Sequence, residues 1–103
     1  MPRACAIAAL GLAVLAGPAL AQDAAQTCAK MDREDRLGPL TVAQCHCNYS
    51  VADQVLDADI RALLFDAWYT GANNMAMVEA LKPASRVRRQ FSRLQNELKK
   101  HCS

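Results

Sequence analysis

Cysteine and histidine are the residues whose chemistry and spacing stand out in this chain. Cys45, His46 and Cys47 form a compact Cys-His-Cys element, and His101 directly precedes Cys102. Cys28 precedes the Cys-His-Cys element in the sequence. Thiols and imidazoles in such clusters either bind a soft metal ion or, where the sulfurs are oxidised, form disulfides. Whether the protein resides in an oxidising or a reducing compartment decides between these two uses.

The first 21 residues have the pattern of a secretory signal peptide. Arg3 supplies a positive charge, residues 4–16 form an apolar stretch of 13 residues, and small residues fill positions 19–21. Thirteen apolar residues are too few to span a bilayer, so we expect no transmembrane segment. The sequence therefore predicts cleavage before Gln22, a periplasmic or secreted location, and a single domain over residues 22–103.

Two disulfides are expected in that domain. Cys5 leaves with the signal peptide, and an even number of cysteines in a small exported chain is typical of a disulfide scaffold. A domain of this size builds a core that only marginally offsets chain entropy, so cross-links matter. On the chain-entropy model, a long closed loop stabilises the fold by roughly 4 kcal/mol and a short one by about 3 kcal/mol.

The pairing of the cysteines follows from helical geometry. Residues two apart on a helix point about 200° away from each other, so Cys45 and Cys47 are not expected to bridge each other. One should pair with Cys28 and the other with Cys102. Because Cys45 lies on the apolar stripe of its predicted helix, we favour Cys45–Cys102 with Cys28–Cys47. The crossed arrangement is a close alternative, since sequence does not fix connectivity.

A metal site is the alternative interpretation of the same residues. Cys45, His46, Cys47, His101 and Cys102 together offer thiolates and imidazoles that suit zinc or copper. Against this, a Cys-x-Cys spacing is not the usual zinc motif, and an oxidising compartment consumes unprotected thiols. We therefore expect structural disulfides and no cofactor.

Charge is divided unevenly along the chain. Residues 22–81 carry nine acids against four basic residues, a balance of −5, whereas residues 82–103 carry seven basic residues against Glu97, a balance of +6. The arginines that mark a possible docking surface on the last predicted helix are Arg86, Arg88, Arg89 and Arg93. An acidic protein or an anionic envelope surface would fit them, whereas nucleic acid is disfavoured because no aromatic residues are interleaved. The simpler alternative is a solvated helix face.

Catalysis finds little support in the residue types. The two histidines flank cysteines that are expected to be oxidised, so no Ser-His-Asp set can be assembled. No glycine-rich phosphate loop occurs. Asp57 and Asp59 are close carboxylates, but Asp57 is better explained as a helix cap. We expect a binding protein rather than an enzyme.

The elements that must position these residues are helices. Apolar residues recur at helical spacing over 41–56, 57–71 and 84–101, and a short helix is predicted over 73–81. The segment 22–37 shows only a weak helical cue. No alternating β pattern is present. The fold class is therefore all-α, a small bundle of three to four helices stapled by two disulfides.

Local signals place the ends and faces of these helices. Thr41 and Gln44 form a capping-box pattern. Trp68 and the methionines Met75 and Met77 are expected in the core, the methionines as flexible filler. Tyr69 is expected to face outwards.

Overall fold

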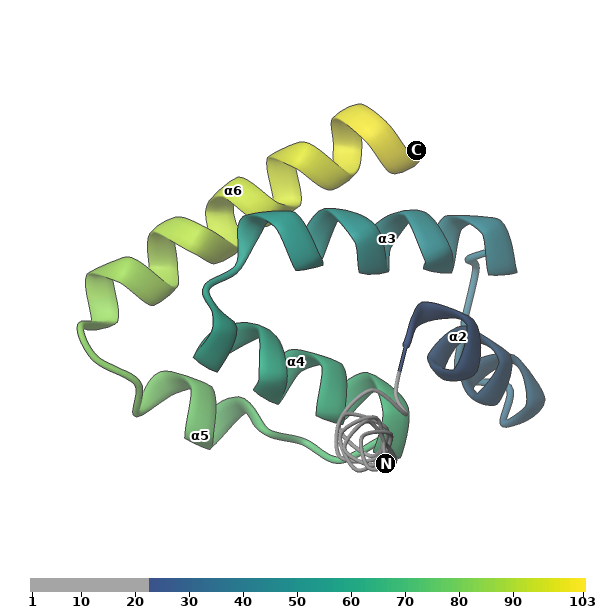
Figure 1. The fold of residues 1–103 in the computed structure, drawn as a ribbon, viewed down its shortest axis with the longest axis horizontal. Coiled ribbons are helices and arrows are strands. Elements are labelled where there is room, and N and C mark those ends of the chain that lie inside the picture. Colours follow the sequence, from purple (N-terminus) through teal and green to yellow (C-terminus); the bar gives the residue numbers. More distant parts are fainter. Residues whose placement is uncertain (1–22) are drawn as a thin grey trace, which may run out of the picture.

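The computed structural model describes residues 23–103, so the predicted signal peptide at 1–21 lies outside the described residues. Five helices and no strand occur in this part of the chain (Figure 1). They are α2 (Ala24–Arg33), α3 (Val42–Val55), α4 (Ala58–Thr70), α5 (Met75–Glu79) and α6 (Ala84–Cys102). The all-α class and the two disulfides are confirmed. The expected three to four helices were too few.

Helix α2 is the element that the sequence pattern underestimated. The Asp23 side chain accepts a hydrogen bond from the backbone N–H of Gln26 at 2.8 Å, which caps the helix start. Lys30 and Arg33 lie in the last turn, where cations favour the helix dipole. Only Thr27 and Cys28 of this helix are buried. With so little apolar surface, α2 depends on tertiary packing, which periodicity does not reveal.

Helix α3 starts as predicted and buries most of its predicted apolar stripe, although Val42 at its first position is 40% exposed. Thr41 Oγ1 accepts from Gln44 N at 3.0 Å, and Gln44 Oε1 accepts from Thr41 N at 2.9 Å, which completes the capping box. Cys45, Tyr49 and Ala52 of the predicted stripe are buried.

Helix α4 begins and ends where expected, but its start lacks the expected side-chain cap. Gly71 adopts a positive φ of 83°, and its N–H bonds to the Ala67 carbonyl at 2.8 Å. At the start, Asp57 occupies the N-cap position without a side-chain cap hydrogen bond, so its predicted capping role is wrong. Its carboxylate instead pairs with Arg86 at 3.0 Å.

The main core forms where α3, α4, α5 and α6 meet. Its buried members are Ala52, Leu56, Ile60, Val78, Val87 and Leu94. Trp68 is partly buried and packs against this cluster, and the Tyr49 ring stacks on Phe65 with centroids 3.8 Å apart. The core role expected of Met75 and Met77 is wrong, because these residues are 53% and 52% exposed. Helix α5 turns only Val78 inwards.

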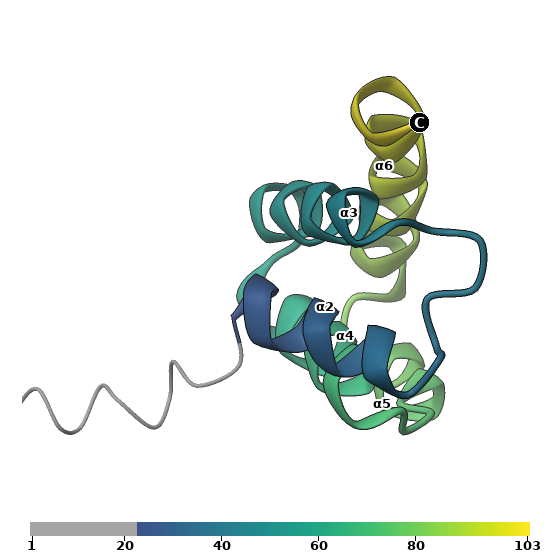
Figure 2. The ribbon, with the colours of Figure 1, turned by 90° about the vertical axis from the view of Figure 1, so that its right-hand side faces the viewer.

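Helix α3 lies between two groups of helices. Helix α6 runs along one side of α3, while α2 and α4 lie on another side (Figures 1 and 2). In Figure 2 the pair α3 and α6 stands above α2, α4 and α5. Side chains that leave α3 in different directions therefore meet different partners.

This arrangement corrects the favoured disulfide pairing. The bonds are Cys28–Cys45 and Cys47–Cys102, which is the crossed alternative. Cys45 does face a buried cluster, but that cluster contains Cys28 and Leu37, because α2 covers this side of α3. Cys47 points to the other side, where α6 ends. The predicted pairing was wrong because it assumed that Cys45, which faces the core, lies next to the last helix.

The two disulfides should differ in their susceptibility to reduction. Cys28 and Cys45 are 0% and 4% exposed, whereas Cys47 and Cys102 are partly exposed. Thiol–disulfide exchange requires access of the attacking thiolate to sulfur. Limited dithiothreitol treatment of the folded protein, followed by alkylation and peptide mass analysis, should therefore label Cys47 and Cys102 first. Labelling of Cys28 and Cys45 at the same rate would contradict this assignment of access.

Candidate functional site

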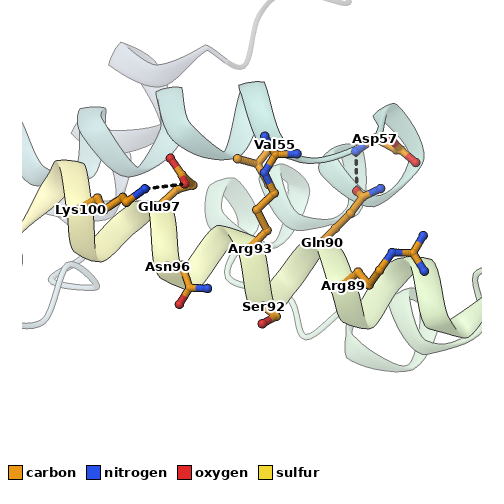
Figure 3. A pocket seen from close by; sticks show the side chains of 9 residues that line it. All are labelled: Val55, Asp57, Arg89, Gln90, Ser92, Arg93, Asn96, Glu97 and Lys100. Carbon is orange, nitrogen blue, oxygen red and sulfur yellow. Dashed lines mark hydrogen bonds and ion pairs between the residues drawn. The ribbon is translucent and has the colours of Figure 1, made fainter.

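An open groove runs along one face of α6. Arg89, Arg93, Asn96 and Lys100 recur at steps of four, three and four, which places them on one side of the helix. The groove has a volume of about 920 Å³, and Val55 at the end of α3 contributes to its other wall. The full lining consists of Val55, Asp57, Arg89, Gln90, Ser92, Arg93, Asn96, Glu97 and Lys100 (Figure 3).

Arg89 and Arg93 are exposed cations of this groove that have no side-chain partner. Neither side chain makes an ion pair or a hydrogen bond with a group of residues 23–103. Figure 3 shows Arg93 reaching from α6 towards Val55, with Arg89 one turn away on the same helix. Their guanidinium groups are therefore available to an anionic ligand.

Two acidic residues, Glu97 and Asp57, reduce the net positive charge of the groove. Glu97 lies 3.7 Å from Lys100 Nζ and 3.2 Å from His101 Nε2, so it holds the residues at the far end of α6. Asp57 lies at the opposite end, where its backbone N–H donates to Gln90 Oε1 at 2.7 Å. The groove thus offers separated positive charges with amides between them, rather than an unbroken basic surface.

Arg86 belongs to the framework and not to the groove. Its guanidinium pairs with Asp57 at 3.0 Å and with Asp59 at 2.9 Å, and it donates to the Lys82 carbonyl. Its side chain is only 19% exposed. These contacts fasten the start of α6 to the junction of α3 and α4.

The electrostatics of this junction follow from Arg86. The Gln90 side chain and then the Arg86 guanidinium hold the pKa of Asp57 below its ordinary value, and Arg86 does the same for the pKa of Asp59. The two carboxylates in turn raise the pKa of Arg86. Both aspartates are therefore held in the charged form.

The structure separates the four arginines that the sequence grouped together. It brings Arg89 and Arg93 into one groove, engages Arg86 in ion pairs, and leaves Arg88 exposed outside the groove. Sequence reasoning missed the groove residues Gln90, Asn96 and Lys100, although the helical spacing of 89, 93, 96 and 100 was a usable signal. It missed them because it counted charge per segment instead of charge per helix face.

The cations of a second basic cluster already bind groups of the protein itself. Lys30 Nζ donates to the Tyr69 carbonyl at 2.9 Å, and Arg36 donates to the Trp68 carbonyl at 2.8 Å. Cations at a helix C-terminus satisfy its free carbonyls and oppose its dipole. Lys30 also lies 5.1 Å from the Tyr69 ring centroid, so Tyr69 is partly covered rather than free as an outward contact. Hydrogen bonds from Lys30 and Arg36 lower the pKa of Glu34, which completes the cluster.

The residues of the metal interpretation do not assemble into a metal site. Cys45 and Cys47 are bonded to different partners, and neither they nor Cys102 retain a thiolate. His46 is exposed, while His101 contacts Glu97. Within residues 23–103 no group of three or more His, Cys, Asp or Glu side chains could hold an ion.

Comparison with known proteins gives no match to a protein-family model, to a curated protein or to a solved structure. None of the helices in residues 23–103 combines the length and the apolar character needed to cross a membrane.

The ion pairs of Arg86 with Asp57 and Asp59 should make the stability of the fold depend on pH under acidic conditions. A carboxylate whose pKa is lowered in the folded state stabilises the fold above its ordinary pKa of 3.8, and this stabilisation is lost as the pH falls through the lower folded value. Arg86→Gln removes the guanidinium from both aspartates. Its melting temperature should therefore fall less steeply than that of the wild type between about pH 5 and about pH 2.

Arg88→Gln is the matched control, because Arg88 lies two residues away and makes no ion pair with the described residues. Its melting temperature should follow the wild-type pH dependence. Identical pH profiles for Arg86→Gln and the wild type would contradict the assigned role of the junction.

Proposed function

We propose that this protein is a small exported binding protein, without catalytic chemistry of its own, that docks an anionic partner in the groove of α6. Arg89, Arg93 and Lys100 supply the positive charge. The single observation that carries the proposal is the pair Arg89 and Arg93, which are exposed one turn apart in a groove and unpaired within the described part of the chain.

The position of these arginines argues against a merely dipole-compensating role. Favourable interaction between cations and the helix dipole falls off within the last turn. Lys99 and Lys100 occupy the last turn of α6, whereas Arg89 and Arg93 lie in the first half and the middle of this 19-residue helix. Their charge therefore contributes little to helix stability, and binding is the better explanation for its presence.

The groove is held rigidly at both ends. The Cys47–Cys102 disulfide fixes the end of α6 to α3, and the Arg86 ion pairs fix its start. Val87 and Leu94 bury the opposite face of α6 in the core. A groove ordered in advance loses less entropy on binding, which favours affinity for a ligand of matching charge.

The two disulfides support an exported location. Such bonds persist in oxidising compartments and are rare where thiols are kept reduced. A partner at an envelope surface, or an acidic protein in the same compartment, would meet the groove in its oxidised and ordered form.

Reversal of the groove charges tests the proposal. Arg89→Glu with Arg93→Glu should lower the salt concentration at which the protein elutes from an anionic resin such as heparin, and should abolish capture of partners from envelope extract. Salt screens charges over about 8 Å at physiological ionic strength, so wild-type binding itself should weaken steeply with added salt. The melting temperature should change little, because both side chains are exposed.

Arg88→Glu with Lys99→Glu is the matched control, since it reverses two cations of the same helix outside the groove. It changes the net charge by the same amount. If this control loses as much retention as the groove variant, net charge alone governs binding and the groove has no special role.

A further inference from the structure

The pattern of charge along the groove carries information about the partner. The helical rise of 1.5 Å per residue separates the positions of Arg89 and Arg93 by about 6 Å along α6. An extended peptide advances about 3.3 Å per residue, so this distance corresponds to about two of its residues, and residues two apart point to the same face of the peptide. Carboxylates at positions 1 and 3 of an extended peptide would therefore both face these two arginines.

We propose that the anionic partner is an acidic extended segment of a protein, in which two carboxylates on one face are bound by Arg89 and Arg93. This inference rests on the proposed function and adds the chemical class of the partner. Arginine suits the task, because its planar guanidinium donates two parallel hydrogen bonds to one carboxylate.

The side chains between the cations suit a peptide backbone. Gln90 and Asn96 carry amides, which both donate and accept hydrogen bonds as peptide groups do. The Gln90 side chain is oriented by the hydrogen bond that its Oε1 accepts from the Asp57 N–H. Figure 3 shows this bond at one end of the groove and the Lys100–Glu97 pair at the other, so polar groups are placed along its whole length.

The acidic residues of the groove disfavour a dense polyanion. A nucleic-acid strand carries one negative charge about every 3.4 Å, so phosphates that follow the groove would also come close to Asp57 and Glu97. A peptide can leave these positions uncharged. Sparse charges in the ligand therefore match sparse cations in the site.

A lipid surface fits the groove poorly. Membrane-binding helices insert an apolar face, but the apolar residues Val87 and Leu94 of α6 are buried in the core. Val55 is the apolar side chain that lines the groove. A flat array of headgroups would meet the outer residues Arg88 and Lys99 more readily than the hollowed face.

Fluorescence anisotropy with the oxidised protein tests the inference. The probe is a labelled hexapeptide of serine and glycine with aspartate at positions 1 and 3, which share one face of an extended chain. A peptide of the same composition with aspartate at positions 1 and 2, which point to opposite faces, is its control. The first peptide should bind more tightly, and Arg89→Gln with Arg93→Gln should weaken its binding by about tenfold, as expected for two exposed charge pairs. Arg88→Gln should leave it unchanged.

Two further probes separate failure of this inference from failure of the proposed function. Tighter binding of anionic phospholipid vesicles or of a single-stranded oligonucleotide, lost in the Arg89 and Arg93 variant, would overturn the peptide inference and keep the docking groove. Equal affinity for the two peptides would also overturn it. If no probe depends on Arg89 and Arg93, the proposed function fails as well.

Discussion

The structure depends on one constraint, which is that two cysteines two residues apart on α3 tie this helix to different neighbours. Helical geometry turns Cys45 and Cys47 about 200° from each other, so the bonds leave α3 on different sides. Cys45 holds α2, and Cys47 holds the end of α6. The domain has a modest core, with Ile60 the largest fully buried side chain. Its helices are therefore positioned as much by these covalent ties as by apolar packing.

Charge is used in two distinct ways around this frame. Lys30, Arg36 and Arg86 are bound to carbonyls or carboxylates of α4, the long helix that neither disulfide reaches. Arg89 and Arg93 have no such task in the described residues. An arginine count does not distinguish these roles, because residue type is the same in both. Only the position of the acidic partners in space separates cations that hold the fold from cations that face outwards.

Much of the fold was predictable, because its signals are local. The capping box at Thr41 and Gln44, the stop at Gly71 and the apolar stripes of α3, α4 and α6 follow from spacing alone. The disulfide pairing did not follow, since it depends on which side of α3 is covered by α2, and α2 itself carries too weak a pattern. The site was predictable in part. Helical spacing aligns Arg89 and Arg93, but the loss of Arg86 to Asp57 and Asp59 requires the tertiary arrangement.

The separations of the two disulfides impose an order on biogenesis. Cys28 and Cys45 are 17 residues apart, so they can bond as soon as this short segment of the new chain meets an oxidant. Cys47 must wait for Cys102, which arrives 55 residues later. During this interval Cys47 competes with Cys45 for Cys28, at almost the same separation. Packing of α2 on α3 buries Cys45 beside Cys28 and Leu37, and this packing favours the native bond over Cys28–Cys47. The α6 groove, one end of which is fixed by the Cys47–Cys102 bond, is therefore completed last.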